Sequence, residues 1–140
     1  MSKIVQSLWI GEYLSSLEIM CIKSFLKKGH EFHLYTYDKV KNIPEGTTIK
    51  DGNEILPKSE IFRYSNGSVS AFSNWFRYKL LLDKGGWWVD TDIVCLKYFD
   101  DVSDTIFTSE FTGEGNTHIT SGVIKTTPNC PVMKYCWDYC

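Results

Sequence analysis

Two aspartates, Asp90 and Asp92, are the side chains of this sequence best suited to chemistry. They stand two positions apart within residues 87–96, a run that is otherwise apolar except for Thr91 between them. If that run is one buried strand, residues i and i+2 point to the same side of the sheet, and the two carboxylates lie a few ångström apart. Two neighbouring negative charges in an apolar strand need a compensating cation. A divalent ion such as Mg²⁺ or Mn²⁺ takes oxygen ligands and leaves room for substrate phosphates, so the pair predicts a metal and phosphate site.

The alternative is that the strand ends here and that water hydrates both carboxylates at a turn. Acidic residues at this spacing occur by chance in many proteins, so only the surrounding sequence can distinguish a metal site from a hydrated turn. Arg77 adds a related question, because a cation in a strongly apolar helix needs an anion. Its partner is either a structural carboxylate or a phosphate or sugar group of a substrate.

The elements that would position these residues follow the order of an α/β protein. Residues 3–10 form an apolar segment that predicts a buried strand. Ser15 and Glu18 make a capping box, which predicts a helix that ends near Gly29. A second strand is expected at residues 32–37. Strand, helix and strand joined by short connections are typical of a parallel unit.

The second half of the chain continues this pattern after a polar stretch at residues 39–70, within which we expect a short strand at 47–50. A helix over residues 71–84 has wide apolar faces and is stopped by Gly85 and Gly86. The strand at 87–96 carries the aspartates. The remaining predicted elements are strands at 105–110 and 119–125, a loop between them at 112–116, and a helix over 132–140. We therefore predict one α/β domain spanning residues 1–140.

The composition excludes several other classes of protein. The 140 residues are 43% hydrophobic, enough for one domain with one core, and 15% aromatic, which suits either core packing or the stacking of sugars and bases. The net charge of −2 favours neither nucleic acid nor an anionic membrane as partner. Five irregularly spaced cysteines fit neither a disulfide framework nor a zinc site. With no leader-like segment and no apolar run of membrane-spanning length, we expect a cytoplasmic protein.

A longer motif surrounds the two aspartates. It consists of Ser73-Asn74-Trp75-Phe76-Arg77-Tyr78, then Leu80-Leu81, then Gly85-Gly86-Trp87-Trp88-Val89-Asp90-Thr91-Asp92. This run resembles the signature of the glycosyltransferases with a sugar-binding region containing a DXD motif, a group that includes capsular-polysaccharide and mannosyltransferase-like enzymes. The family pattern is approximately Ser-Asp-x-x-Arg-Tyr, an apolar helix, and Gly-Gly-x-Tyr-x-Asp-x-Asp. Three further segments look similar to the family: Leu8-Trp9-Ile10-Gly11, Tyr35-Thr36-Tyr37-Asp38, and Ser121-Gly122-Val123-Ile124-Lys125 with Pro128.

The resemblance implies a GT-A fold, which is a Rossmann-like sheet that binds a nucleotide-sugar. It implies metal-dependent transfer of a hexose from a UDP- or GDP-sugar to a saccharide or other acceptor, with retention of anomeric configuration. Asp92 would be the firmer ligand of Mn²⁺ or Mg²⁺, and Asp90 would lie between the metal and the ribose and sugar. Arg77 would reach the donor from the preceding helix, and Trp9 and Tyr37 would lie near the base.

Two positions and the length depart from the family pattern. Asn74 stands where the family has Asp, which keeps a hydrogen-bonding group but loses the charge that would orient the donor sugar. Trp88 replaces the family Tyr, a change that we expect only to repack the strand. Relatives usually continue beyond this length and gain there a further metal ligand and much of the acceptor site. We therefore expect the donor-binding part, with the acceptor part short or absent, and the many aromatic residues favour burial of one face in a homodimer.

Two other functions compete with this one. The first is a non-catalytic module that keeps the nucleotide-sugar pocket but lacks a complete acceptor site. The second is a phosphatase of the haloacid-dehalogenase type, whose opening motif is matched by Asp90-x-Asp92-x-Val94. That interpretation requires the motif on the first strand of the fold.

A few other polar residues are weaker candidates. His118 could return to the metal from a loop as a third ligand, although a plain loop histidine is the simpler interpretation. Glu110 and Glu114 are candidate acceptor contacts, against the alternative of solvated loop charges. We expect His30 and His33 at the surface. Cys136 and Cys140 are expected on the apolar face of the last helix.

Overall fold

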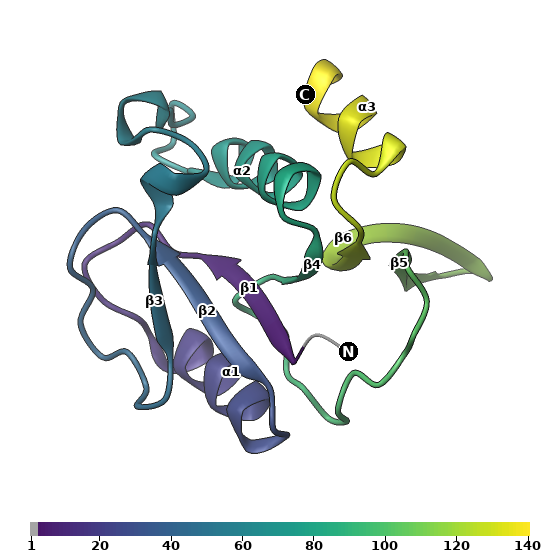
Figure 1. The fold of residues 1–140 in the computed structure, drawn as a ribbon, viewed down its shortest axis with the longest axis horizontal. Helices are drawn as coiled ribbons and strands as arrows, with labels where there is room; N and C mark the ends of the chain where they lie inside the picture. The colour runs from purple at the N-terminus through teal and green to yellow at the C-terminus, as the bar shows by residue number, and fades with distance from the viewer. Residues whose placement is uncertain (1–2) are drawn as a thin grey trace.

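A computed structural model of the chain describes residues 3–140, in which a six-stranded sheet lies between helices (Figure 1). In chain order the elements are β1 (Ile4–Leu8), α1 (Ser16–Lys27), β2 (Glu31–Thr36), β3 (Thr48–Asp51), the 3₁₀ turns η1 (Gly52–Glu54) and η2 (Lys58–Glu60), α2 (Ser70–Asp83), β4 (Gly86–Val89), β5 (Ile106–Gly113), β6 (Asn116–Thr126) and α3 (Pro131–Tyr139). The strand order is β3-β2-β1-β4-β6-β5. Strands β1 to β4 are parallel, whereas β6 runs antiparallel to β4 and β5 runs antiparallel to β6. The predicted α/β, Rossmann-like sheet is confirmed.

Each face of the sheet has its own hydrophobic core. On one face α1 places Cys21, Ile22 and Phe25 against alternate residues of the strands, such as Leu34. On the other face α2 packs its aromatic and leucine side chains against residues of opposite parity, such as Tyr35. Full burial of a large apolar side chain contributes about 1.5–3 kcal/mol. Most of the aromatic content is therefore used to hold the layers together.

Local signals set several element ends where the sequence predicts them. The Ser15 side chain and the Glu18 carboxylate form the capping box at the start of α1. Gly85 has a φ of +64°, and a Cβ there would come within 2.7 Å of the backbone nitrogen of Pro128. No L side chain fits that space, so Gly85 allows the chain to pass closely from α2 into β4.

The strand that carries the aspartates is shorter than predicted, so the expectation for residues 87–96 is wrong. Strand β4 ends at Val89, although the Asp90 backbone N–H still donates to the Gly122 carbonyl at 2.8 Å. Residues 91–92 then form a turn, in which the Ile93 N–H lies 3.3 Å from the Asp90 carbonyl oxygen. Aspartate is disfavoured in strands, so Asp90 and Asp92 favour an end of the strand here. The apolar residues 93–96 that follow do not form a strand. Asp90 and Asp92 are therefore not two steps apart along a strand.

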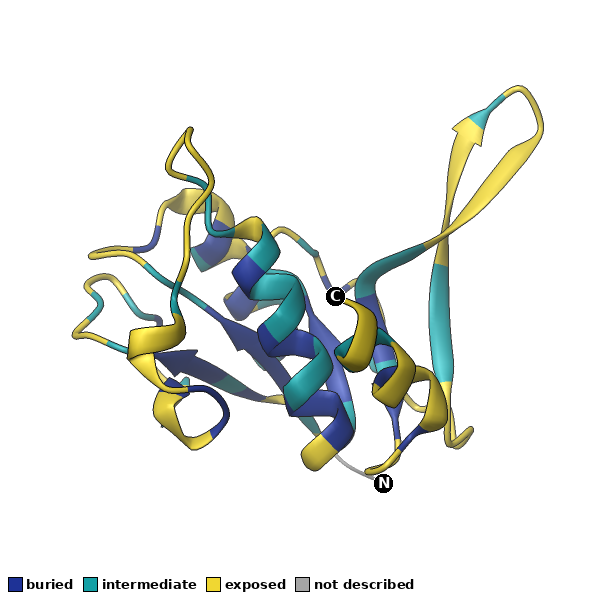
Figure 2. Cartoon of the chain, turned by 90° about the horizontal axis from the view of Figure 1, so that it is seen from above, coloured by how far each residue is buried: buried dark blue, intermediate teal, exposed yellow. Residues whose placement is uncertain are grey.

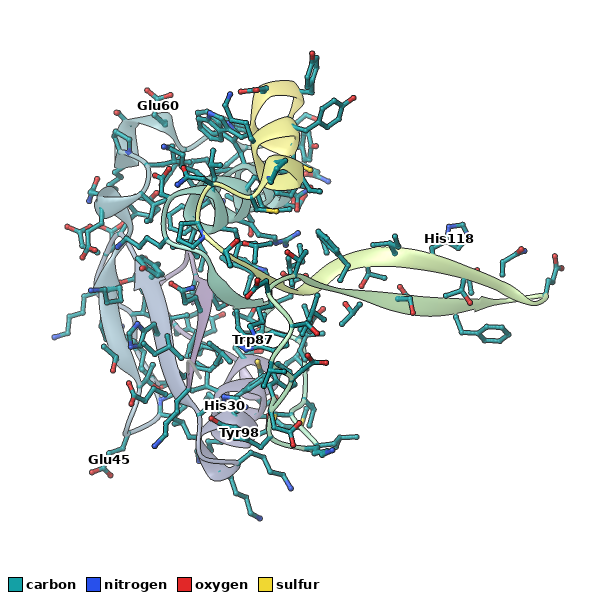
Figure 3. All side chains as sticks on the ribbon, turned by 45° about the vertical axis from the view of Figure 1, so that its right-hand side comes forward. His30, Glu45, Glu60, Trp87, Tyr98 and His118 are labelled. Carbon is teal, nitrogen blue, oxygen red and sulfur yellow. The ribbon has the colours of Figure 1, made fainter. Side chains whose placement is uncertain are left out.

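Strands β5 and β6 form a hairpin that extends well beyond the predicted strands. The expected loop at 112–116 is reduced to a turn at Glu114 and Gly115, whose φ angles are +50° and +78°. The hairpin projects from the body of the molecule and most of its outer part is exposed (Figure 2). Because no loop returns from it, His118 lies on β6 and not on a loop near the aspartates (Figure 3).

His30 is buried, contrary to the expectation that it lies at the surface. Only 4% of the residue is exposed. Its Nδ1 lies 3.0 Å from the Lys3 carbonyl oxygen, and the Phe99 backbone N–H donates to its Nε2 at 3.1 Å. The Tyr98 ring stacks on the imidazole with centroids 4.3 Å apart (Figure 3). His30 thereby fastens the segment that follows the aspartates to the base of β1, whereas His33 is half-buried on β2.

Helix α3 packs on α2 through stacked indoles. The rings of Trp75 and Trp137 lie 4.9 Å apart and nearly parallel, and Met133 is buried below them. Cys136 is half-buried against this core, but Cys140 is exposed after the helix ends. The expectation that both cysteines share the apolar face therefore holds for Cys136 alone.

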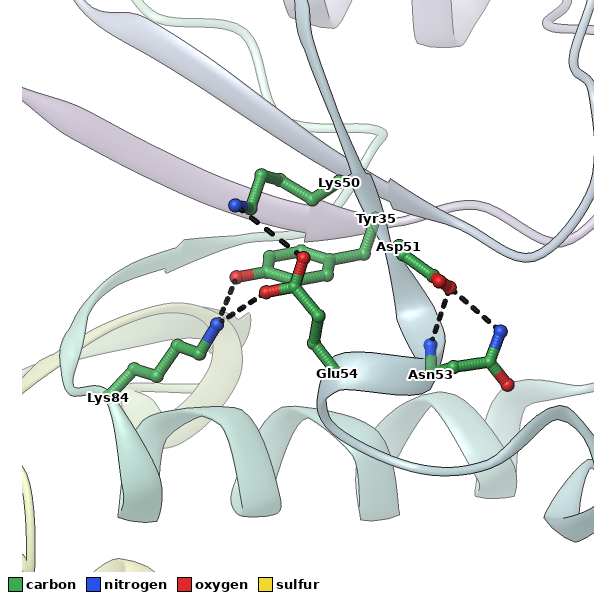
Figure 4. A network of polar contacts seen from close by, with 6 residues as sticks. All are labelled: Tyr35, Lys50, Asp51, Asn53, Glu54 and Lys84. Carbon is green, nitrogen blue, oxygen red and sulfur yellow. Dashed lines mark hydrogen bonds and ion pairs between the residues drawn. The ribbon is translucent and has the colours of Figure 1, made fainter.

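A polar network joins the end of α2 to β2, β3 and η1 (Figure 4). Lys84 Nζ lies 2.9 Å from a Glu54 carboxylate oxygen and 3.5 Å from the Tyr35 hydroxyl. Lys50 approaches the second Glu54 oxygen at 3.6 Å. Exposed pairs of this kind contribute about 0–1 kcal/mol each.

Among residues 3–140, none of the helices combines the length and the apolar character needed to cross a membrane.

Candidate functional site

The candidate site lies where parallel strands of the sheet reach their carboxyl ends, the edge at which open α/β sheets bind ligands. A pocket of about 360 Å³, the aspartate pocket, opens there beside residues 90–92. It is lined by Ser7, Leu8, Leu17, Glu18, Ser70, Ser73, Asn74, Arg77, Trp88, Asp90, Thr91, Asp92 and Ser121. Side chains from β1, α1, α2 and the turn after β4 therefore share one hollow.

Asp90 is held at this pocket by two donors. Arg77 Nη2 on α2 lies 2.7 Å from Asp90 Oδ1, and the Trp88 indole N–H donates to the same oxygen at 2.8 Å. The guanidinium also lies over the Trp88 ring, 5.0 Å from its centroid. Both bonds end on Oδ1, so the lone pairs of Oδ2 are not committed to these donors. The structural carboxylate that Arg77 needs is thus a residue of the candidate site itself.

Burial dominates the electrostatics of Asp90. Desolvation raises the pKa of its carboxyl above the ordinary value, and the nearby charge of Asp92 acts in the same direction. The Arg77 cation and the Trp88 hydrogen bond oppose this rise. The expectation that Trp88 only repacks the strand is therefore wrong, since its indole N–H stabilises the ionised form of Asp90.

Three buried polar atoms at this pocket have no protein partner. They are Ser7 Oγ, Arg77 Nε and Arg77 Nη1, and across residues 3–140 they are the complete set of such side-chain atoms. Ser7 is 1% exposed and Arg77 is 3% exposed. Buried polar groups without a partner are rare in proteins and call for an explanation such as a ligand or an ordered water. Their concentration beside Asp90 singles out the aspartate pocket.

The carboxylates offer ligands that a hard divalent cation accepts. Asp92 is exposed, and it lines the pocket together with Asp90. No group of three or more His, Cys, Asp or Glu side chains that could hold a metal occurs within residues 3–140. His118, considered as a possible third ligand, lies on β6 and does not line the pocket. Mg²⁺ is usually held through one or two carboxylates together with substrate phosphates. Two aspartates fit such a site.

The predicted base-binding residues line a different hollow. Trp9 and Tyr37 face a pocket of about 600 Å³, the tryptophan pocket, whose other lining residues are Ile10, Gly11, Glu12, Asp38, Lys39, Lys41 and Arg63. The Trp9 indole N–H donates to the Tyr13 carbonyl at 3.1 Å, and the Tyr37 hydroxyl donates to the Leu56 carbonyl at 2.8 Å. Their polar atoms are thus engaged internally. Both rings are partly packed on the hydrophobic cores, and only their remaining surface is open to the pocket. Leu8 and Trp9 are adjacent in the chain and line the two pockets in turn.

Asn74 lies one helical turn before Arg77 on α2 and lines the aspartate pocket. The structure also adds pocket residues that the sequence did not single out. Ser7 carries a recognisable signal, because it is a polar residue near the end of an apolar strand. Glu18 belongs to the capping box and Ser73 to the motif around residues 73–92, but neither pattern indicates a role at the site. Lys41 and Arg63 carry no sequence signal for the tryptophan pocket.

Comparisons with known proteins bear on the family and on the fold. No curated protein matches the sequence. Among solved structures, a chain described as "PaToxG Glycosyltransferase" is similar over 98% of this chain, with a TM-score of 0.67 and 16% sequence identity. This chain spans 58% of the length of that one, and the likeness concerns the fold. The profile of a family described as "Glycosyltransferase sugar-binding region containing DXD motif" matches residues 15–110, more than half of the sequence. The chain belongs to this family of DXD glycosyltransferase sugar-binding regions.

Proposed function

We propose that this chain binds a UDP- or GDP-sugar with Mn²⁺ or Mg²⁺ and transfers its hexose to a saccharide acceptor. The observation that carries the proposal is the set of unpartnered buried atoms of Ser7 and Arg77 beside Asp90. A ligand rich in oxygen, such as a sugar diphosphate, offers acceptors for the two free guanidinium nitrogens. Family membership supports the same class of donor.

In this proposal Asp92 and Oδ2 of Asp90 hold the metal. When bound, the ion supplies positive charge that stabilises the diphosphate as it leaves. Arg77 and Trp88 also act through Asp90, because their hydrogen bonds to Oδ1 fix its orientation and favour its ionised form. Trp88 is a positioning residue for the carboxylate, whereas Arg77 both orients Asp90 and offers its other two nitrogens to the donor. Asn74 contributes an uncharged hydrogen-bonding side chain to the wall of the same pocket.

The nucleoside would occupy the tryptophan pocket. The aromatic rings of Trp9 and Tyr37 offer apolar surfaces for a base, and Lys39, Lys41 and Arg63 bring positive charge to the same hollow. Its position next to the aspartate pocket along β1 allows one ligand to place its base and diphosphate in the two hollows. Arrangement of both at the carboxyl ends of parallel strands is typical of nucleotide sites in open sheets.

In the reaction, the acceptor hydroxyl oxygen forms a bond to the anomeric carbon of the donor. The bond from that carbon to the diphosphate oxygen breaks, its electron pair leaves with the diphosphate, and the hydroxyl proton passes to that departing group. The developing charge lies beside the aspartate pocket, where fixed groups can stabilise it without reorganising. Retention of anomeric configuration is carried over from the family resemblance.

The test is the thermal stability of the 140-residue chain with UDP, GDP or CMP, each with and without Mn²⁺. A ligand present at about 100 times its dissociation constant stabilises the folded state by roughly 2.7 kcal/mol, which for a domain of this size raises the melting temperature by roughly 8 °C. We expect this rise with UDP or GDP, only when Mn²⁺ is present. The Asp92→Asn variant should lose it.

Asp104→Asn is the matched control, because Asp104 is exposed and lines neither pocket. It should respond as the wild type does. Sugar release from UDP-glucose and GDP-mannose then separates an enzyme from a non-catalytic module. Nucleotide binding without any release would favour the module, and no response to any nucleotide would reject the donor site.

A further inference from the structure

A second hollow lies on the other side of the two aspartates. This hairpin pocket, of about 520 Å³, is bounded by the turn after β4 and by the inner half of the β5–β6 hairpin. Its lining consists mainly of carboxylates and hydroxyls: Asp90, Asp92, Glu110, Thr108, Ser109, Thr120 and Ser121, with Ile93, Gly122 and Val123. Its volume falls within the range of small-molecule sites.

The two faces of the hairpin differ in chemistry. Thr108 and Thr120 are cross-strand partners whose hydroxyl oxygens lie 3.2 Å apart, and Glu110 pairs with His118 next along the ladder. Because side chains alternate along a strand, these four residues share one face. Three of them, Thr108, Glu110 and Thr120, line the hairpin pocket. The opposite face carries Ser109, Thr117 and two exposed apolar side chains, Phe111 and Ile119, which are 70% and 77% exposed. Of these four residues only Ser109 reaches the hairpin pocket.

We propose that the hairpin pocket is the acceptor subsite and that it takes a hydroxyl-rich ligand, a saccharide, with Glu110 accepting hydrogen bonds from its hydroxyls. Each sugar hydroxyl can donate one hydrogen bond and accept others, and a carboxylate offers strong acceptors to such donors. Ser121 supplies a hydroxyl that can do both. Thr108 donates to the Val123 carbonyl at 2.9 Å, so Thr120 donates to Thr108 and can only accept from a sugar hydroxyl. The pocket therefore matches the hydrogen-bonding capacity of a sugar unit better than that of an apolar ligand.

The position of this pocket suits a second substrate. Asp90, Asp92 and Ser121 line both the aspartate pocket and the hairpin pocket, so they form the wall between them. Group transfer requires the two reacting molecules to lie within bonding reach of one another. A saccharide in the hairpin pocket would lie beside a sugar diphosphate in the aspartate pocket. In this respect the inference rests on the proposed function.

A saccharide is favoured over a protein acceptor by the distribution of apolar surface. The apolar side chains that a protein partner would cover, Phe111 and Ile119, lie on the face turned away from Glu110. Within the pocket itself only Ile93 and Val123 are large and apolar. Protein interfaces are usually centred on such apolar and aromatic side chains.

The test follows backbone amide resonances of the 140-residue chain by NMR while maltose or cellobiose is added in the presence of diamagnetic Mg²⁺ and either UDP or GDP. We expect saturable shifts at residues 108–110 and 120–123, and none with sorbitol, an open-chain polyol. Glu110→Gln should weaken disaccharide binding about tenfold, because it replaces a charged acceptor with a neutral one. Glu114→Gln is the matched control: the same substitution at the exposed tip of the same hairpin should leave binding unchanged.

Three outcomes overturn the inference. The first is the absence of saturable shifts with both disaccharides, and the second is an equal effect of the two glutamine variants. The third is a serine- or threonine-containing peptide that shifts Phe111 and Ile119 while the disaccharides shift nothing, which would make the acceptor a protein. Thermal stabilisation by nucleotide is measured on the same samples. Nucleotide binding without disaccharide binding rejects this subsite alone, whereas disaccharide binding without nucleotide binding rejects the proposed donor site alone.

Discussion

Arg77 and Asp90 form an ion pair in which the cation is the more deeply buried partner. Arg77 Nη2 lies 2.7 Å from Asp90 Oδ1, and the side chains are 4% and 33% exposed, respectively. A guanidinium keeps its proton in any protein environment, whereas a carboxylate can take up a proton when burial disfavours its charge. Loss of Asp90 therefore leaves a buried charge that cannot be neutralised, whereas loss of Arg77 leaves a carboxylate that can.

This difference predicts unequal effects of two substitutions on the free energy of unfolding. Asp90→Asn leaves a buried guanidinium without its anion and should cost about 3 kcal/mol. Arg77→Met leaves a carboxylate that is partly solvated and able to become neutral, and it also removes the two unpartnered nitrogens. We expect it to cost about 1 kcal/mol or less. Urea denaturation of the two variants measures both values.

The double variant Arg77→Met/Asp90→Asn is the control for this comparison. Once the cation is gone, the second change should cost little, so the double variant should be more stable than Asp90→Asn alone. Additive effects, or a larger cost for Arg77→Met than for Asp90→Asn, would contradict the view that the buried cation depends on Asp90.

Local patterns were enough to predict the elements but not the contacts of the site. The capping box of Ser15 and Glu18 depends on residues within one helical turn, and Gly85 marks a turn by its own backbone freedom. By contrast, the Trp88 hydrogen bond depends on where the chain leaves the sheet after Val89. That point is fixed by the Asp90 bond to Gly122, a residue 32 positions away in the sequence.

The burial of His30 shows the same limit. Its neighbours in the sequence, Gly29 and Glu31, are both exposed, so nothing local distinguishes it from a surface residue. It is buried because Tyr98 and Phe99 return to it from a segment about 70 residues further along the chain. Contacts between distant segments cannot be read from the spacing of residues, although the motif around residues 73–92 located the candidate site.

Trp88→Phe should weaken metal-dependent nucleotide binding as well as the fold. The substitution keeps an aromatic ring in the core but removes the indole N–H that donates to Asp90 Oδ1. Loss of a hydrogen bond that orients a metal-binding carboxylate typically lowers metal affinity about 10- to 100-fold, so the affinity for UDP or GDP with Mn²⁺ should fall by roughly that factor. Isothermal titration calorimetry measures this change.

Trp87→Phe provides the comparison for that variant. Trp87 is the adjacent residue of β4, is similarly buried, and points to the other face of the sheet against Phe99. The loss of ring volume is the same, but no bond to Asp90 is lost. If both variants lower nucleotide affinity equally, the effect comes from packing and the role assigned to the Trp88 N–H is wrong.

Because the two donor pockets are separate, one substitution should weaken binding of the base and another should weaken binding of the diphosphate. Trp9 lines the tryptophan pocket and Asp92 lines the aspartate pocket, and neither residue lines both. Trp9→Leu should reduce affinity for the nucleoside diphosphate by roughly 5- to 150-fold, corresponding to the loss of about 1–3 kcal/mol of stacking. The affinity for inorganic pyrophosphate with Mn²⁺ should stay unchanged.

Asp92→Asn is expected to lower the affinity for both ligands, because both would use the metal. Calorimetry with UDP, GDP and pyrophosphate on the two variants gives the full comparison. Equal losses for pyrophosphate and nucleotide in Trp9→Leu would mean that Trp9 acts on the shape of the whole site and does not contact a base.

His30 predicts that the fold loses stability in mild acid. Burial lowers the pKa of His30 from its ordinary value of 6.5, and this outweighs the opposite effect of the Lys3 carbonyl. The unfolded chain therefore binds a proton at a higher pH than the folded chain does. The contribution of His30 is complete above pH 6.5 and is lost as the pH falls from there toward the lowered pKa.

Urea denaturation at several pH values between about 7.5 and 5 measures this loss. His30→Phe keeps a ring against Phe25 and Tyr98 but cannot bind a proton, so its free energy of unfolding should vary less over this range than that of the wild type. Burial also lowers the pKa of His33, which makes His33→Gln the necessary comparison. His30 accepts a hydrogen bond from Phe99, and protonation of Nε2 would remove that bond along with the burial of a neutral ring. If His33→Gln abolishes the pH dependence of the free energy of unfolding and His30→Phe retains it, the effect comes from His33 and the prediction for His30 is wrong.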